Sequence, residues 1–237
     1  MDAGCLVLVA TPIGNLGDLT DRARRALAEA DYWIVEDTRV SGKLQSYLTC
    51  RKPMRVLNDH TGLGIVERYF REIGEGARVA LLTDGGSPSI SDPGAALADK
   101  CLDAGIQVDA IPGPSAVTTA LSASGFFGQR FVFLGFLGRK EGAIRSDLEP
   151  FAESPLTIVL FESPFRVSKL LATAFTALGP RRYAICRELT KAHQQVFRER
   201  LPAIPDESVV PRKGEVTIVI EGLRRGEAKQ REARDDD

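Results

Sequence analysis

Histidine and cysteine are scarce in this chain, and their scarcity limits the chemistry that it can carry out. The 237 residues include two histidines, His60 and His193, and four cysteines that lie far apart without a CxxC pair. A disulfide scaffold and a zinc knuckle both need closely spaced cysteines, so the sequence favours neither. Metal sites and Ser-His or Cys-His catalysis depend on imidazole groups. We therefore expect no catalytic metal, and reduced thiols as in a cytoplasmic protein.

The chain also lacks an excess of either charge and any long apolar run. It holds 31 Lys and Arg against 32 Asp and Glu, a net charge of −1, so no global field draws it onto nucleic acid without specificity. The apolar run 5–10 is too short for the hydrophobic region of a signal peptide, and no stretch approaches the roughly 18 apolar residues of a membrane span. These absences predict a cytoplasmic protein that neither enters membranes nor coats polyanions.

The remaining composition is that of a globular protein with a hydrophobic core, since 43% of the residues are hydrophobic and 27% are charged. Short runs rich in Val, Ile and Leu alternate with segments of helical period. Strands that are apolar on both faces indicate sheets covered by helices on both sides, so the predicted fold class is α/β. Strands are expected at 5–10, 31–36, 77–83, 107–111, 130–136, 156–162, 182–188, 194–199 and 215–221.

A cluster of Ser and Gly at 122–130 predicts a linker between two domains. We divide the chain there into an N-terminal α/β domain, 1–122, and a C-terminal α/β domain, 123–222. The first sheet is expected to be mostly parallel. The last strands of the second half have little helix between them, so the second sheet is expected to be mixed. The charged segment 223–237 has almost no apolar residues, which predicts a disordered tail.

Glycine-rich segments follow three predicted strands of the first half, at 11–18, 83–94 and 111–117. Ligands bind α/β sheets at the carboxyl ends of strands, so we expect the three loops to converge on one crevice. The first loop has the spacing GxxG, with Gly14 and Gly17, and the chain contains no GxxxxGK[ST], so a nucleotide-phosphate cradle is disfavoured. Taken alone, this loop is equally consistent with an ordinary strand-to-helix turn.

Seven segments of the sequence resemble the tetrapyrrole-methylase family of S-adenosylmethionine enzymes, and within it the methyltransferases of small-subunit ribosomal RNA. The resemblance covers about 1–222, and EDTR, SDPG, PGPSAVT and ELTK are its most specific parts. The segments are ATPIGNLGDLTDRA, VEDTR, TDGGSPSISDPG, IPGPSAVTTAL, FLGFLGRK, FESPFR and CRELTKAHQQVFRE. The resemblance implies two α/β domains with S-adenosylmethionine in the cleft between them, usually in a homodimer. It also implies methylation of a cytidine ribose 2′-hydroxyl in the decoding region of 16S rRNA in the 30S subunit.

The resemblance also implies which residues contact S-adenosylmethionine, mostly through backbone and apolar groups. The contacts expected from the first half are Pro12, Gly14, Gly85, Gly86, Ser87, Ile90, Ser115 and Ala116. The contacts expected from the second half are Phe161 or its neighbours, Leu189 and the segment Gly214, Glu215 and Val216.

Methyl transfer to a ribose hydroxyl requires a positioned acceptor oxygen and a group that takes its proton. With few histidines, that group is expected to be a carboxylate, a lysine of depressed pKa or a chain of waters. The predicted catalytic residues are Asp37, Arg39 and Lys191. Arg39 can clamp a phosphate while Asp37 orients it or the ribose; alternatively, Asp37 only caps the next helix and Arg39 pairs with it. The other candidates for the proton acceptor are Asp92, Glu162 and Glu188.

Lys191 belongs to a polar cluster that includes Glu188, Thr190 and His193. This cluster follows a predicted strand and is suited to proton transfer, but it is equally consistent with a solvated strand end. The basic residues expected to contact RNA phosphates lie beside strand ends. They are Arg39, Arg139, Lys140, Arg145 and Arg166.

The sequence departs from the family pattern at a few positions. The loop that usually reads DAGTPLISDPG has small residues at Gly85, Gly86 and Ser87, which preserves its character. Gly138 replaces the proline of FLPRK, and Phe165 stands where a histidine is common. Phe165 excludes a catalytic histidine at that position.

Other functions compete with RNA methylation on the sequence alone. The nearest is methylation of a tetrapyrrole, such as a precorrin or uroporphyrinogen, by the same fold. A nicotinamide-dependent oxidoreductase would use Gly14, Gly17 and Asp37. A non-catalytic RNA-binding assembly factor is the third alternative.

Overall fold

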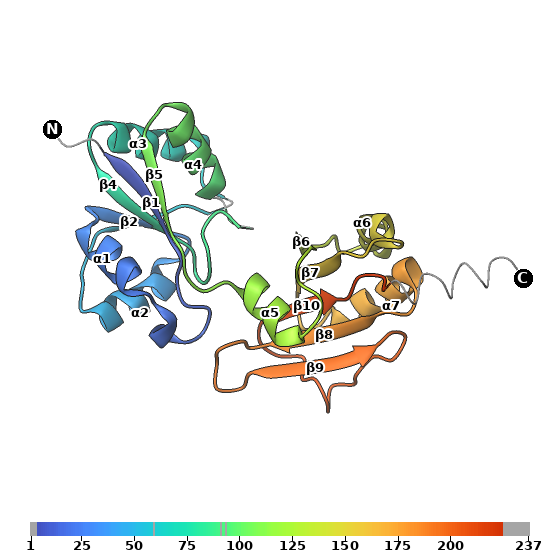
Figure 1. Ribbon diagram of the computed structural model, residues 1–237. Helices are drawn as coiled ribbons and strands as arrows, with labels where there is room; N and C mark the ends of the chain where they lie inside the picture. Colours follow the sequence, from blue (N-terminus) through green and yellow to red (C-terminus); the bar gives the residue numbers. More distant parts are fainter. Residues whose placement is uncertain (1–3, 59, 91, 93, 225–237) are drawn as a thin grey trace, which may run out of the picture. The chain divides into compact units, whose positions relative to one another are not determined.

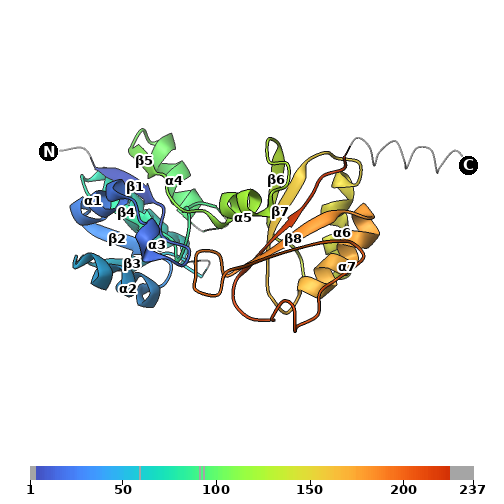
Figure 2. The ribbon, with the colours of Figure 1, turned by 60° about the horizontal axis from the view of Figure 1, so that its bottom comes forward.

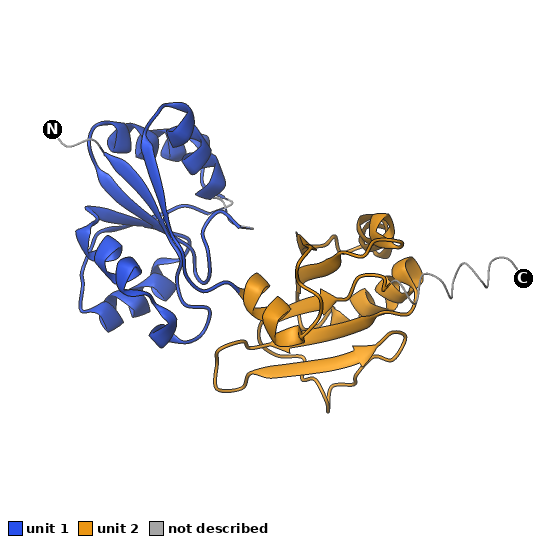
Figure 3. Cartoon of the chain, in the orientation of Figure 1, with its two compact units in different colours: residues 1–115 blue, residues 116–237 orange. Residues whose placement is uncertain are grey.

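The computed structural model describes residues 4–58, 60–90, 92 and 94–224, and the chain forms two compact units, Met1–Ser115 and Ala116–Asp237 (Figure 3). Each unit has its own five-stranded sheet, which confirms the α/β class. The units divide before the helix at 116–124, whereas the predicted boundary, between 122 and 123, falls within its last turn. This helix packs on strands of the second sheet. The division into functional domains stays a prediction.

The first unit contains an all-parallel sheet in the strand order β3-β2-β4-β1-β5. Four of its strands coincide with the predicted runs: β1, β2 and β4 are buried on both faces, whereas β5, at the edge, is mostly exposed. The strands are β1 (Cys5–Val9), β2 (Tyr32–Val35), β3 (Met54–Val56), β4 (Arg78–Leu82) and β5 (Gln107–Ile111).

Helices cover both faces of the first sheet (Figure 1). Leu27 of α1 and Leu44 of α2 pack with Val7 on one face. Ile73 of α3 and Leu97 of α4 pack with Leu6 on the other face, since successive side chains of a strand point in opposite directions. The helices are α1 (Asp21–Glu29), α2 (Thr38–Leu48), α3 (Leu63–Gly74) and α4 (Gly94–Asp103), with a short 3₁₀ helix, η1 (Leu16–Asp18).

Two neighbouring inner strands of the first unit, β1 and β4, form a topological switch point. The chain leaves β1 through α1 and reaches β2 on one side of β4, whereas it leaves β4 through α4 and reaches β5 on the far side of β1. Open α/β sheets bind ligands outside the carboxyl ends of strands at such a point. Two of the glycine-rich loops begin there.

The second unit contains a mixed sheet in the strand order β6-β7-β10-β8-β9, as predicted. β6 pairs with β7 in parallel; β10 runs antiparallel between β7 and β8, and β9 is antiparallel to β8. The strands are β6 (Phe131–Phe136), β7 (Thr157–Glu162), β8 (Arg182–Arg187), β9 (Gln195–Arg200) and β10 (Val216–Ile220).

Helices of unequal extent cover the faces of the second sheet (Figures 1 and 2). Leu148 of α6 and Leu170 of α7 pack with Ile218 in the main core of this unit. On the opposite face lies α5, where the Cys186 thiol approaches the carbonyl oxygen of Ala120 at 3.7 Å. The helices are α5 (Ala116–Ser124), α6 (Glu141–Leu148) and α7 (Val167–Leu178), with a 3₁₀ helix, η2 (Glu149–Phe151).

The last described residues belong to the second unit. Leu223 is buried, and its N–H donates to the carbonyl oxygen of Ser154 at 2.8 Å. Arg224 donates to the buried carboxylate of Glu221. The segment predicted to be disordered thus begins with two ordered residues, and its remainder lies outside the described residues. None of the helices in the described part of the chain combines the length and apolar character that a membrane span needs.

Candidate functional site

Two glycine-rich loops of the first unit are tied together by their backbones. The N–H of Thr11 donates to the carbonyl oxygen of Gly86 at 2.9 Å, and the N–H of Gly86 donates to that of Thr11 at 3.0 Å. The Thr11 hydroxyl donates to the carbonyl oxygen of Thr83 at 3.1 Å. Gly86 has a φ of 98°, which favours glycine over any other residue. The loops after β1 and β4 are therefore held side by side.

Glycines also allow close backbone approach between the loops. A Cβ on Gly85 would lie 3.3 Å from the carbonyl oxygen of Pro12, and a Cβ on Gly113 would lie 2.9 Å from the Cβ of Ala10. The N–H of Ala10 donates to the carbonyl oxygen of Ile111 at 3.2 Å, which joins the third loop to the first. The expected cofactor residues Pro12, Gly85 and Gly86 thus lie together, while Gly14 is exposed farther along its loop.

The loop before α4 presents a buried polar group and an exposed apolar side chain. Ser89 has a φ of 67°, and its buried hydroxyl oxygen has no hydrogen-bond partner among the described residues. The next side chain, Ile90, is 51% exposed. Asp92 accepts from the N–H of Gly94 at 2.8 Å at the start of α4. An orphaned buried hydroxyl beside an exposed apolar side chain fits a loop that contacts a ligand.

Three carboxylates gather at the carboxyl ends of β2 and β4. The Asp84 carboxylate accepts from the N–H of Asp37 at 3.2 Å, and Glu36 accepts from the Thr83 hydroxyl at 3.0 Å. Burial, followed by the charge of Glu36, raises the pKa of Asp84. Asp84 was not among the predicted site residues, although it follows β4 next to β2, which is also followed by carboxylates. This concentration of negative charge favours a cationic ligand.

Asp37 and Arg39 form a bidentate pair at the start of α2. The Asp37 carboxylate accepts from the backbone N–H of Arg39 at 2.8 Å and from its guanidinium at 2.6 to 3.1 Å. The side-chain and then the backbone hydrogen bonds lower the pKa of Asp37 to about 2. The structure therefore contains the capping arrangement that was the alternative to a catalytic role. The Arg39 side chain is nevertheless 88% exposed, so a phosphate can reach it.

In the second unit, Lys191 bridges two carboxylates. Its Nζ donates to Glu188 and to Glu215, each at 2.8 Å. Burial alone would lower the pKa of Lys191, but the hydrogen bonds to the two glutamates outweigh it, and the net direction is upward. Lys191 is therefore protonated near neutral pH. This is opposite to what a lysine of depressed pKa, one of the predicted proton acceptors, would require.

The backbone around Lys191 is in a conformation that most residues avoid. Glu188 and Thr190 have φ values of 51° and 66°, and Gly214 has a φ of 88°. A Cβ on Gly214 would lie 2.6 Å from the Glu188 carboxylate. The hydroxyl oxygen of Thr190 is buried without a partner among the described residues, and Leu189 is buried between these two strained positions. Strain of this kind persists where the surroundings enforce it and is common at functional sites.

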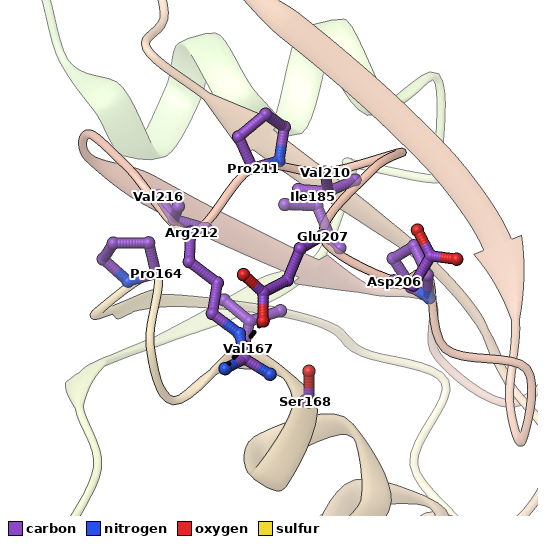
Figure 4. Close-up of a pocket in the computed structure, with 11 residues that line it drawn as sticks. Pro164, Val167, Ser168, Ile185, Asp206, Glu207, Val210, Pro211, Arg212 and Val216 are labelled. Atoms are coloured by element: carbon purple, nitrogen blue, oxygen red, sulfur yellow. Dashed lines mark ion pairs between the residues drawn. The ribbon is translucent and has the colours of Figure 1, made fainter.

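The remaining expected cofactor residues of the second unit lie in different surroundings. Phe161 packs against Phe133 and Phe136, with ring centroids 4.9 and 5.5 Å apart. Val216 is buried and lines a cavity of about 140 Å³ between the start of α7 and the segment 205–212 (Figure 4). Small-molecule sites occupy roughly 300–1,000 Å³, so this cavity alone is too small for a nucleoside cofactor.

An ion pair crosses this cavity. Arg212 and Glu207, which both line it, form the pair at 2.9 Å (Figure 4). Ser115 and Ala116, the last two expected cofactor residues, are half-buried where the two units meet in sequence.

The basic residues expected to contact RNA differ in their surroundings. Arg139 and Lys140 are exposed in the turn between β6 and α6. Arg145 pairs with Glu149 at 2.6 Å. Arg166 donates to the carbonyl oxygens of residues 137 and 138 at 3.1 and 3.0 Å, and its guanidinium lies 3.1 Å from the buried Glu162 carboxylate. Arg166 therefore organises the turn, whereas Arg139 and Lys140 are exposed and their contact with RNA stays a prediction.

Two more features bear on the chemistry. Burial raises the pKa of Glu162, whose side chain is 1% exposed. Among the residues that the structure describes, no group of three or more His, Cys, Asp or Glu side chains is arranged to hold a metal ion.

Comparisons with known proteins identify the family. The family model described as Tetrapyrrole (Corrin/Porphyrin) Methylases matches residues 5–205. The chain is 40% identical over 220 residues to Ribosomal RNA small subunit methyltransferase I of Thermotoga maritima, covering 92% of this chain and 99% of that protein. It is 43% identical over 225 residues to the protein of the same name from Mycobacterium tuberculosis, covering 94% and 79%.

A solved structure has the same fold. It is uroporphyrin-III C-methyl transferase from Thermus thermophilus in complex with S-adenyl homocysteine, with a TM-score of 0.64, 22% identity and coverage of 91% of this chain and 97% of that one. At this identity the likeness concerns the fold alone. From the family model and the two close relatives, the chain belongs to the tetrapyrrole (corrin/porphyrin) methylase family and, within it, to the ribosomal RNA small subunit methyltransferase I proteins.

Proposed function

We propose that this protein is an S-adenosylmethionine-dependent methyltransferase of small-subunit ribosomal RNA. Its acceptor would be the ribose 2′-hydroxyl of a cytidine in the decoding region of 16S rRNA. The observation that carries the proposal is the 40% identity to a ribosomal RNA small subunit methyltransferase I over nearly the whole length of both chains. The tied glycine loops at the switch point of the first unit supply a matching ligand site.

The residues at this switch point fit S-adenosylmethionine. Gly85 and Gly86 leave backbone groups open to close approach, and the orphaned Ser89 hydroxyl can bond a polar group. The cofactor carries a positive sulfonium, which the nearby carboxylates of Glu36 and Asp84 favour electrostatically. When bound, it supplies an activated methyl group for in-line transfer. The protein must then position the acceptor oxygen and handle its proton.

Arg39 and Asp37 are suited to act together on the RNA. Two N–H groups of the Arg39 guanidinium can donate to two oxygens of an RNA phosphate instead of to the Asp37 carboxylate. Asp37 would then lose the side-chain hydrogen bonds that contribute most to its low pKa, and its carboxylate would become a better proton acceptor. Phosphate binding and activation of the carboxylate would thus occur in the same step.

Lys191 is suited to hold charge rather than to accept a proton. Its protonated Nζ neutralises Glu188 and Glu215, which fixes the strained turn at 188–190. Leu189 lies in this turn and is one of the expected cofactor contacts. We therefore assign Lys191 a positioning role in the second unit.

The proposal includes the assembled 30S subunit as substrate and a homodimer as the active form, both in the cytoplasm. A chain of net charge −1 does not bind RNA through a global field. Its selectivity would come from local basic residues, Arg139 and Lys140 among them, and from the shape of a folded RNA.

Transfer of a labelled methyl group tests the proposal. The protein is incubated with labelled S-adenosylmethionine and, in parallel, with 30S subunits or with uroporphyrinogen. Label in the 16S rRNA and none in the tetrapyrrole is the expected result. Label in the tetrapyrrole alone would contradict the proposal and would show that the protein methylates tetrapyrroles instead.

A further inference from the structure

Two phenylalanines of the second unit are unusually exposed. Phe136 is 65% exposed and Phe165 is 73% exposed, whereas phenylalanine is normally among the most buried residues. Phe136 ends β6, and Phe165 follows β7, its parallel neighbour. Because the carboxyl ends of parallel strands meet at one edge of a sheet, the two rings belong to the same edge.

The segments that carry these rings are held in place. The guanidinium of Arg166, next to Phe165, donates to the carbonyl oxygens of Leu137 and Gly138, next to Phe136. The Phe136 ring also packs against the half-buried ring of Phe161 at 5.5 Å. The exposure of Phe136 and Phe165 is thus a feature of ordered turns.

Cationic side chains surround the same turns. Arg139 and Lys140 are exposed directly after β6. The Nζ of Lys169, in the first turn of α7, donates to the carbonyl oxygen of Arg139 at 3.1 Å. Exposed aromatic rings beside cations are what proteins use to bind single-stranded nucleic acid, because bases stack on the rings and phosphates meet the charges.

The charge also argues against a second copy of this chain as the occupant. At a two-fold interface each patch meets its own copy, so the cations of one protomer would face those of the other. Like charges brought together in this way oppose association. An RNA strand carries the complementary charge.

We propose that Phe136 and Phe165 stack on unpaired bases of the RNA substrate while Arg139 and Lys140 contact its backbone. The inference rests on the proposed function and extends it: the substrate must present an unpaired segment at this edge of the second unit. Folded RNA is usually recognised through unpaired loops, whose bases are free to stack on aromatic side chains.

The test uses a short single-stranded RNA with a 2-aminopurine base, whose fluorescence is quenched by stacking. We expect quenching by the full-length protein, and a loss of affinity of about 5- to 100-fold in Phe136→Ala and in Phe165→Ala. Phe165→Tyr keeps a ring and should keep the affinity. The control is Phe175→Ala, which removes a 38% exposed phenylalanine from the middle of α7, and it should bind like wild type.

Two results would overturn the inference. One is unchanged quenching and affinity in Phe136→Ala and Phe165→Ala, provided that both variants melt like wild type. The other is a change in their sedimentation that shows the two rings to lie in a protomer interface. Methyl transfer by the wild-type protein to 30S subunits is measured separately, so a failure of the proposed function with quenching intact is distinguishable from a failure of stacking.

Discussion

Thr11 and Gly86 exchange two backbone hydrogen bonds, of 2.9 and 3.0 Å, between the loops that follow the neighbouring strands β1 and β4 of the first unit. The two bonds form an isolated antiparallel β-bridge outside the sheet, which fixes how the loops face each other. Gly86 can take part only because its φ is 98°. The position of both loops therefore depends on one residue that has no side chain.

Replacing Gly86 by alanine should disturb this arrangement. A Cβ at positive φ costs about 1–3 kcal/mol, so we expect Gly86→Ala to lower thermal stability and to weaken S-adenosylmethionine binding in calorimetry by about tenfold or more. The control is Gly42→Ala in α2, where a Cβ would meet nothing within 4 Å. That change should stabilise the helix slightly. Equal cofactor affinity in both variants would contradict the role of Gly86.

The pair of Asp37 and Arg39 predicts a measurable pKa change. In Arg39→Ala the side-chain hydrogen bonds are lost, so the pKa of Asp37 should rise from about 2 toward the ordinary value near 3.9. In the wild type, the interaction of Arg39 with Asp37 stabilises the fold above the unfolded pKa of Asp37, and this stabilisation is lost as pH falls through about 2. In Arg39→Ala this pH-dependent stabilisation should be absent. Carboxyl NMR titration measures the shift, and the KM for 30S subunits should increase.

Arg68→Ala is the control for this change, since Arg68 is an exposed arginine paired with Glu72 at 2.9 Å. It should leave both the pKa of Asp37 and the KM unchanged. A pKa of Asp37 that stays at about 2 in Arg39→Ala would show that other groups set it.

Lys191 should act as a fixed positive charge. Lys191→Arg keeps the charge between Glu188 and Glu215 and should retain most activity, whereas Lys191→Met should lower kcat by about 10²-fold. The pKa of Glu188, which the Lys191 hydrogen bond lowers, should rise in Lys191→Met. The pH dependence of kcat decides between the roles: a rate that rises with the deprotonation of Lys191, and is lost in Lys191→Arg, would make it a base.

Glu162 predicts a pH-dependent stability. Burial raises the pKa of Glu162 in the folded state above its value in the unfolded state, so the folded protein binds the proton more tightly. The free energy of unfolding therefore falls as pH rises from the unfolded pKa through the folded pKa. Glu162→Gln removes this penalty. The change in melting temperature on mutation should therefore be more favourable at about pH 7 than at about pH 4.

Glu149→Gln, in an exposed pair with Arg145 at 2.6 Å, is the control for Glu162 and should change stability little at either pH. An identical effect of Glu162→Gln at both pH values would mean that Glu162 has the same pKa in the folded and unfolded states.

Most of the fold could be predicted from the sequence because both sheets bury strands under helices. Apolar runs such as 77–83 mark their strands without any knowledge of partners. The strand Met54–Val56 was not predicted because it has three residues, none of them buried. The helix Ala116–Ser124 has mostly small side chains, which give no sign of which sheet it covers.

The site was predictable in its loops and less so in its contacts. Glycine, proline and serine mark the loops by their local backbone preferences. The bonds between Thr11 and Gly86, and between Lys191 and Glu215, join residues far apart in sequence, and no local pattern encodes them. Asp84 was missed for the same reason, since its raised pKa comes from burial and from Glu36 on a neighbouring strand.

The most direct test of the central claim is mass-spectrometric mapping of methylated nucleotides in 16S rRNA from 30S subunits incubated with this protein and S-adenosylmethionine. We predict one new 2′-O-methylated cytidine in the decoding region, absent without the protein and greatly reduced with Gly86→Ala. If the wild-type protein binds S-adenosylmethionine yet leaves 16S rRNA without any new methyl group, the proposed function is wrong.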